Sequence, residues 1–280
     1  NGEREAMRDF IKEMELHSET LGIDLSKLEQ GTPEWHRAKA GVVSASKAYI
    51  LLMKGSRAPF PVDLEIKVIK RGVNAVTFGG ETFEGTKAAC TEFVRNKLPL
   101  IPSETRKTYM CELVGSVTTG LVPEEIKAKP LQWGKDNEQD AQDAYSAKTF
   151  ETVCDMGFIY QDGSMRAGCS PDGLIVGQEK GLELKCPWST AVWVAFAAFG
   201  EIKKEEIIQC QFSMMITGYK SWGFSKFDPR NVNCKKLHVV EIERDEKMIE
   251  QLRDGLDLFI KDMDVMLKNL GLEFGQQWQT

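Results

Sequence analysis

Two short segments joined by a polar loop constrain the fold of this chain more than any other part of it. Residues 169–175 read Cys-Ser-Pro-Asp-Gly-Leu-Ile, and residues 181–187 read Gly-Leu-Glu-Leu-Lys-Cys-Pro. In the first segment Pro and Gly bracket Asp172, which is typical of a strand that ends on a turn. In the second, alternation along a strand places Glu183 and Lys185 on one face. If the two strands pair as a hairpin, two carboxylates and one ammonium group converge.

This set of side chains suits hydrolysis of a phosphodiester bond. Two carboxylates bind Mg²⁺ or Mn²⁺ through oxygen and leave coordination positions for water and phosphate. The metal can activate a water molecule and neutralise charge on the leaving oxygen, while Lys185 would orient the water or stabilise charge at phosphorus.

Each motif has an ordinary structural explanation when it stands alone. A Glu-x-Lys pair usually lines a solvated strand face, and Pro-Asp-Gly is most often a plain turn. The combination at hairpin spacing is much rarer and matches the PD-(D/E)xK signature. The local pattern therefore favours a metal-dependent phosphodiesterase.

The remaining pattern predicts an α/β chain with a small central mixed sheet flanked by helices. The 280 residues, 42% of them hydrophobic, are enough to bury a large core. Apolar residues at helical spacing predict helices, and strand-like alternation predicts strands. The expected helices cover residues 3–21, 86–98, 106–117, 134–148, 191–199, 203–216 and 245–270, and the expected strands cover residues 153–160, 165–176, 181–186, 222–227 and 237–242.

We expect one nuclease domain over residues 1–280, with two additions to its core. The first is an N-terminal helical extension of about residues 1–30. The second is an insertion at about residues 61–104, where a Gly-Gly pair, mixed charge and an amphipathic stretch suggest a segment with its own helix.

Composition excludes several other classes of protein. No stretch approaches the roughly 20 apolar residues that cross a bilayer, and the charged N-terminus lacks the apolar core of a secretory signal. The first residue is not Met, which leaves the true start open. The seven cysteines form no Cys-x-x-Cys pair, which argues against a zinc site and fits a reducing cytosol. The net charge of −6 leaves DNA open as a substrate, because an acidic exterior can coexist with a local basic groove.

The signature and several other blocks resemble the phage lambda exonuclease family, the PD-(D/E)xK alkaline exonucleases of phage-type recombination systems. The similarity extends over most of the chain from Gly31 to Trp278, and its main interruption is the segment near residues 61–104. The similar blocks occur in the same order as in the family, at residues 34–36, 41–46, 133–138, 164–174, 181–187, 228–230, 242–247 and 274–278.

The resemblance implies a restriction-endonuclease-like core and a ring-shaped homotrimer. It implies processive 5′-to-3′ degradation of one strand of linear double-stranded DNA to mononucleotides. The 3′ single-stranded tails would serve recombination with a single-strand annealing protein in the bacterial host cytoplasm, without any role for a membrane.

The resemblance also assigns roles at the active site. Asp172, Glu183 and the backbone carbonyl of Leu184 would hold Mg²⁺, with two ions per active site and Mn²⁺ as a substitute. Lys185 would be the catalytic lysine. Glu138 would be the carboxylate of the active-site water network, although without the resemblance it is an ordinary solvated helix residue.

A pocket for the terminal 5′-phosphate is implied as well. Ser46, Ser170 and Gln209 match its serines and its glutamine, while its arginine position falls on Lys39, with Arg37 two residues earlier. A lysine binds phosphate as a point charge without the two-pronged geometry of arginine, so the preference for a phosphorylated end stays open. Taken singly, the two serines are more often a helix cap and a turn residue.

Three further positions bear on DNA contacts. Leu131 matches an apolar wedge that separates the terminal base pair, although an exposed leucine by itself is unremarkable. Arg57 lies close to the position of a DNA-contacting arginine. Ala191 stands where the family has another arginine, so that contact is lost.

Two other functions remain open at the level of sequence. One is a restriction-like or structure-specific endonuclease that uses the same metal site. The other is a catalytically silent clamp on DNA ends, against which the intact Asp172, Glu183 and Lys185 set weighs.

Overall fold

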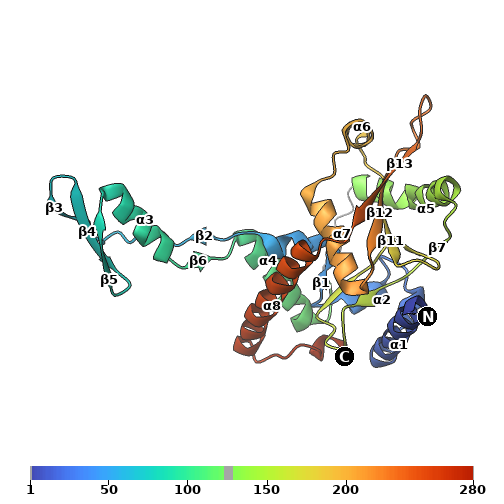
Figure 1. Cartoon of the computed structure of the whole chain (residues 1–280). Coiled ribbons are helices and arrows are strands. Elements are labelled where there is room, and N and C mark those ends of the chain that lie inside the picture. Colours follow the sequence, from blue (N-terminus) through green and yellow to red (C-terminus); the bar gives the residue numbers. More distant parts are fainter. Residues whose placement is uncertain (1, 123–128, 280) are drawn as a thin grey trace. The chain divides into compact units, whose positions relative to one another are not determined.

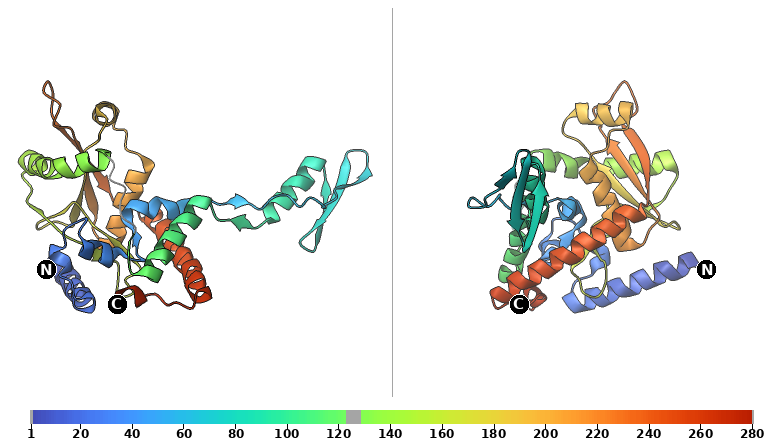
Figure 2. Two further views of the ribbon diagram at one scale, coloured as in Figure 1. Left: turned by 180° about the vertical axis from the view of Figure 1, so that it is seen from behind. Right: turned by 60° about the vertical axis from the view of Figure 1, so that its left-hand side comes forward.

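The computed structural model describes residues 2–122 and 129–279, with side chains described from residue 12 onward (Figures 1 and 2). The chain forms two compact units. The first, here called the nuclease unit, comprises Asn1–Leu52 and Tyr109–Thr280. The second, here called the inserted unit, comprises Met53–Thr108 and contains the whole of the expected insertion.

A five-stranded mixed sheet forms the centre of the nuclease unit. Its strand order is β13-β12-β11-β10-β7. Strands β11 and β12 run parallel, and the other neighbours are antiparallel. The strands are β7 (Val153–Cys154), β10 (Gly173–Ile175), β11 (Lys180–Lys185), β12 (Ser221–Phe227) and β13 (Leu237–Glu243). The three strands expected over residues 181–186, 222–227 and 237–242 are thereby confirmed.

A smaller sheet, in the order β1-β9-β8, lies in the same unit. It contains β1 (Val43–Ser44), β8 (Ile159–Tyr160) and β9 (Ala167–Cys169). The single strands expected over residues 153–160 and 165–176 are wrong, since each is divided between the two sheets. The second break falls at Pro171, which has no N–H to donate to a ladder. The first break contains Gly157, where a Cβ atom would lie 2.3 Å from the carbonyl oxygen of Leu25.

Helices cover both faces of the five-stranded sheet, with α7 (Lys204–Thr217) and α5 (Lys129–Thr149) on opposite sides (Figure 1). Helix α7 is buried from Cys210 to Ile216 and accordingly lacks a polar face. Strand alternation turns Leu182 and Leu184 toward α5, where they pack with Tyr145.

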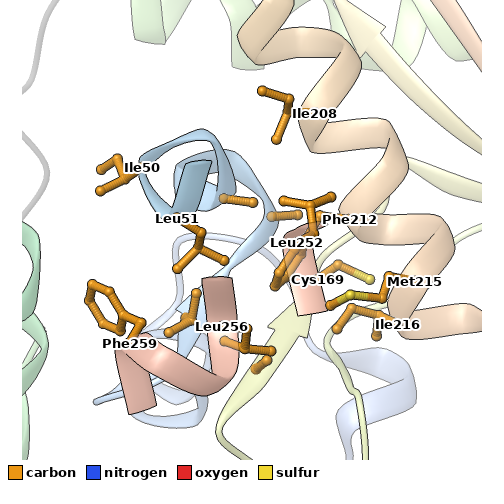
Figure 3. Close-up of a cluster of buried hydrophobic side chains, with 14 of the residues drawn as sticks. Ile50, Leu51, Cys169, Ile208, Phe212, Met215, Ile216, Leu252, Leu256 and Phe259 are labelled. Carbon is orange, nitrogen blue, oxygen red and sulfur yellow. The ribbon is translucent and has the colours of Figure 1, made fainter. Parts of the chain in front are cut away.

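The largest core lies on the α7 side of the sheet. Helix α8 (Glu246–Asn269) contributes one apolar stripe that includes Leu252, Leu256 and Phe259. Figure 3 shows this stripe against the 3₁₀ segment η2 (Ala45–Leu52) and the side chains of α7. The helix α4 (Glu104–Thr119) adds buried residues from Tyr109 onward.

The remaining helices of this unit are α1 (Gly2–Leu21), α2 (Pro33–Lys39), α6 (Thr190–Phe199), and two 3₁₀ turns, η1 (Leu25–Lys27) and η3 (Gln276–Trp278). The ends of α1 and α2 share a small core with Phe158 and Tyr160. All seven expected helices are confirmed to within a few residues at their ends, apart from α5, which begins five residues earlier than expected. No helix in the described part of the chain is long and apolar enough to cross a membrane.

The inserted unit contains a three-stranded antiparallel sheet of β3 (Lys67–Lys70), β4 (Val73–Phe78) and β5 (Glu81–Gly85), covered by α3 (Lys87–Lys97). A separate pair, β2 (Ser56–Arg57) and β6 (Leu100–Ile101), joins the two ends of the unit. The helix was expected and the sheet was not, since β3 is exposed at every residue and shows no apolar alternation. The Gly79-Gly80 turn between β4 and β5, with φ of 59° and 81°, was the available hairpin signal.

Candidate active site

The hairpin inferred from the sequence is present. Strands β10 and β11 pair antiparallel, with Gly173 opposite Leu182, and the Asp172 amide donates to the Leu182 carbonyl at 3.2 Å. The Asp172 carboxylate then turns back onto β11, where its Oδ2 accepts a hydrogen bond from the Leu184 amide at 2.6 Å. Asp172 is therefore fixed beside the strand that carries Glu183 and Lys185.

Glu183 is the most deeply buried carboxylate of this set, with 2% of its surface exposed. Its Oε1 accepts hydrogen bonds from Lys185 Nζ and, at 2.6 Å, from Gln209 Nε2. The Gln209 Oε1 lies 3.4 Å from Lys185 Nζ, so the amide contacts both side chains. Since Gln209 lies on α7, the buried helix orients the two residues of β11.

The charges at this site are unbalanced. Burial, and next the charge of Glu183, raises the pKa of Asp172 well above its usual range. The same two causes, in the same order, raise the pKa of Glu138, which approaches from α5. Burial alone would lower the pKa of Lys185, but the carboxylates of Glu183 and Asp172 outweigh it and raise that pKa. The cationic form of Lys185 is thus favoured, and this one ammonium group faces three carboxyl groups, whose full ionisation would leave an excess of negative charge.

These residues fit a hard divalent cation. The excess negative charge is of the kind that a bound cation neutralises, and the donor atoms are oxygens. Among the described residues no group of three or more His, Cys, Asp or Glu side chains is placed so that it could hold a metal ion. In general, Mg²⁺ takes one or two carboxylates and fills its remaining positions with water and substrate phosphate.

A cleft of about 790 Å³ opens at Asp172 and Glu138. Its other walls come from residues 26–30, from α5 and from the loop at residues 154–157. Gln142, four residues after Glu138 and so on the same helical face, also lines the cleft. Its Nε2 donates to Asp155 Oδ1 at 2.6 Å and approaches the Asp172 carbonyl oxygen at 3.4 Å. Sequence reasoning missed Gln142, although this spacing from Glu138 could have indicated it.

Of the residues expected to bind the 5′-phosphate, Lys39 and Ser170 are connected through contacts with a third residue. Ser170 Oγ donates to the Gly157 carbonyl at 2.6 Å and accepts from Trp35 Nε1 at 3.3 Å. Lys39 Nζ lies 3.6 Å from the centre of the Trp35 ring. Trp35, which sequence reasoning did not single out, therefore connects Lys39 with Ser170, two residues from Asp172.

The other members of that expected pocket have different partners. Gln209 contacts Glu183 and Lys185, as described above. Arg37 Nη2 donates to the Trp278 carbonyl at 3.1 Å, and Trp278 Nε1 donates back to the Arg37 carbonyl at 2.8 Å. Ser46 is exposed in η2, with its Oγ 3.3 Å from that of Ser44.

The remaining predicted DNA contacts, Leu131 and Arg57, belong to different units of the chain. Leu131, on α5, is 50% exposed. Arg57 belongs to the inserted unit, where its Nη1 donates to the carbonyls of Asn96 and Leu98 at 2.8 and 2.9 Å. Its guanidinium group therefore helps to hold β2 against the end of α3.

Comparisons with known proteins identify relatives of this chain. LHK-Exo, an alkaline exonuclease from Laribacter hongkongensis, is 24% identical, with a TM-score of 0.63 over 86% of this chain and 96% of that one. LHK-Exo in complex with dAMP is 25% identical, with a TM-score of 0.64 over 85% and 96%. A phage-related exonuclease from Haemophilus somnus 129PT is 15% identical, with a TM-score of 0.56 over 82% and 96%. These similarities confirm the α/β restriction-endonuclease-like fold.

Sequence comparison identifies the family. The putative uncharacterized protein ExoD of Escherichia coli K12 is 38% identical over 81 residues, which are 29% of this chain and 92% of ExoD. The YqaJ-like viral recombinase domain matches residues 34–220, a range that contains the hairpin, Glu138 and Gln209. The resemblance to phage-type exonucleases is thereby confirmed, and this chain belongs to the YqaJ-like viral recombinase family.

Proposed function

We propose that this protein is a Mg²⁺-dependent exonuclease that degrades one strand of linear double-stranded DNA from its 5′ end. The observation that carries the proposal is the convergence of Asp172, Glu183 and Lys185 on the β10–β11 hairpin. The family supports a role in recombination. The relative LHK-Exo, an exonuclease with a structure in complex with dAMP, supports mononucleotides as products.

The proposed metal ligands are Asp172, Glu183 and the backbone carbonyl of Leu184, for two Mg²⁺ ions that Mn²⁺ can replace. The bound metal would supply a nucleophilic water and neutralise charge at the scissile phosphate. Gln209 keeps Glu183 in place through its 2.6 Å hydrogen bond. The roles proposed for Lys185 and Glu138 rest on the direction of their pKa shifts.

Burial lowers the pKa of Lys185, but the carboxylates of Glu183 and Asp172 outweigh it, which favours the protonated amine. A protonated Lys185 is suited to donate hydrogen bonds to the attacking water or to the phosphate oxygens, where negative charge builds up. Glu138 has a raised pKa beside the same site. A carboxylate of that kind is suited to accept a proton from the water and release it to solvent.

For the DNA end, we propose that Lys39 and Ser170 contact the 5′-phosphate, with Arg37, Ser46 and Gln209 as the further members that the family resemblance assigns. Trp35 supports this pocket, because it contacts both Lys39 and Ser170. The pocket would select the phosphorylated strand end for degradation.

Leu131 is the proposed wedge between the last paired bases, and Arg57 is a proposed DNA contact from the inserted unit. The proposed assembly is a homotrimeric ring that acts processively. It would leave 3′ single-stranded tails for a single-strand annealing protein in the bacterial host cytoplasm. We further propose that residues 61–104 interrupt a single nuclease domain that begins with a helical extension over about residues 1–30.

The test is digestion of linear duplex DNA labelled at either end of either strand, with Mg²⁺ or with EDTA. With Mg²⁺, we expect a label at a 5′ end to be released as a mononucleotide and a label at a 3′ end to remain in single-stranded DNA. We expect no cleavage in EDTA and no loss of covalently closed circles. Lys185→Ala should abolish digestion and retain binding to DNA ends, and the exposed Lys247→Ala should behave as wild type. Cutting of closed circles would identify an endonuclease instead, and end binding without any digestion would identify a silent clamp.

A further inference from the structure

Two tryptophans and an arginine form an aromatic cluster beside the candidate active site. The rings of Trp133 and Trp188 meet edge to face, with their centres 5.8 Å apart and an angle of 86° between planes. The Arg230 guanidinium lies 4.6 Å from the centre of the Trp133 ring. Trp188 nevertheless remains 50% exposed, which is unusual for the largest apolar side chain.

The cluster is held rigidly by hydrogen bonds. Arg230 binds the buried Asp228 through two of its nitrogens, at 2.7 and 2.8 Å. The same guanidinium donates to the carbonyls of Pro187 and Trp188, at 3.2 and 3.1 Å. Asp228 Oδ2 also accepts from Thr190 Oγ1 at 2.8 Å, which secures the chain on the far side of Trp188. An exposed ring on such a restrained backbone loses little conformational entropy when it binds a ligand.

Trp133 lies on α5 and Trp188 lies just after β11, the two elements that carry Glu138 and Lys185. Trp133 precedes Glu138 by five residues on α5, a rise of about 7.5 Å. Trp188 follows Lys185 by three residues, so their Cα atoms are at most about 11 Å apart. Cys186 Sγ lies 3.5 Å from the Asn137 carbonyl oxygen, which joins the two elements between these points. At about 3.4 Å per nucleotide along a strand, the backbone separation between Lys185 and Trp188 corresponds to at most about three nucleotides.

We propose that Trp188 stacks on a nucleobase of DNA within three nucleotides of the scissile phosphate. The inference rests on the proposed function and adds to it a contact with a base. Every base has an aromatic face, so stacking suits an enzyme that must accept any sequence. Trp133 and Arg230 act as positioning residues, because they hold the Trp188 ring in place.

The first test measures binding of a fluorescent linear duplex with a 5′-phosphate to the full chain in EDTA, so that no DNA is consumed. Trp188→Ala should weaken binding roughly 5- to 150-fold, the range found when a stacking side chain is truncated. Trp188→Phe keeps an aromatic face and should bind within about threefold of wild type. Phe199→Ala removes another exposed aromatic ring, 76% exposed at the end of α6, and should have no effect.

The second test identifies what the ring contacts. Duplexes carry a single abasic nucleotide at each of the first four positions from the 5′ end. At one position wild type and Trp188→Ala should bind equally, because the base that Trp188 stacks on is missing. An equal loss of affinity for Trp188→Ala on every duplex would overturn the proposal. So would a change of oligomeric state in Trp188→Ala, which would place the ring in a subunit interface.

The two proposals fail in distinguishable ways. Wild-type protein that binds ends with the expected dependence on Trp188 but digests no DNA would refute only the nuclease function. Wild-type protein that digests linear DNA, together with a Trp188→Ala variant that binds and digests as well as wild type, would refute only the stacking contact.

Discussion

Replacing Asp172 with asparagine should stabilise the metal-free protein even though it removes a proposed metal ligand. The side chain of Asp172 faces the charges of Glu183 and Glu138, against the single opposing charge of Lys185. One net repulsion at roughly 6 Å costs about 3 kcal/mol at an effective dielectric constant of 20. An asparagine oxygen can still accept the Leu184 amide, but the neutral hydrogen bond is weaker by about 1 kcal/mol.

The balance is a gain of about 1–2 kcal/mol in the free energy of unfolding, which corresponds to a rise of about 2–6 °C in Tm for a chain of this size. Because the folded-state pKa of Asp172 is raised, wild type takes up a proton as the pH falls and loses the same repulsion. The advantage of Asp172→Asn should therefore be complete above that raised pKa and shrink as the pH falls below it, toward the ordinary aspartate pKa of about 4 in the unfolded chain.

Thermal unfolding followed by circular dichroism between pH 5 and 9, in EDTA and in Mg²⁺, measures both effects. Mg²⁺ should reverse the order of the two proteins, because a ligand at 100 times its Kd stabilises the wild type by about 2.7 kcal/mol and the variant binds it poorly. Asp140→Asn, on the exposed side of α5, should match wild type throughout. A variant that is less stable than wild type in EDTA at pH 8.5 would refute the reasoning.

Three further predictions concern other parts of the molecule. Gln209→Ala should lower the cleavage rate about 10- to 100-fold, because Glu183 loses its hydrogen bond from the amide. An equal loss on 5′-phosphorylated and 5′-hydroxyl ends would show that Gln209 acts by orienting Glu183 and not by binding the phosphate. Lys39→Ala should weaken binding of 5′-phosphorylated ends roughly 10- to 150-fold, which corresponds to the loss of hydrogen bonds to a charged group. Lys39→Arg should increase the preference for phosphorylated over hydroxyl ends. Competition between the two kinds of DNA end measures both effects, and an unchanged preference would refute a role for Lys39 in phosphate binding. Replacing residues 58–99 by an Asn-Gly turn between the paired strands β2 and β6 should leave a folded, active nuclease. The reason is that the hydrophobic clusters formed by the described residues of the nuclease unit include no side chain from residues 53–108. Aggregation of this variant in gel filtration would contradict the prediction.

The sequence by itself determined the hairpin and the chemistry of its side chains. Asp172 and Glu183 are eleven residues apart, so a turn and the two-residue period of a strand are enough to predict their meeting. The amphipathic helix α8 was likewise predictable, since its apolar spacing shows within a short window. These are local properties, which depend on neighbours along the chain.

Contacts between distant segments were decided only by the tertiary structure. Gln209 reaches Glu183 because α7 packs on the face of the sheet opposite α5, and Trp35 reaches Ser170 across 135 residues. The divided strands around Gly157 and Pro171 depend on which sheet each half joins, a choice that no alternation of side chains encodes. The metal hairpin follows from local rules, whereas its supports, its cleft and the ring of Trp188 follow from packing between elements far apart in sequence.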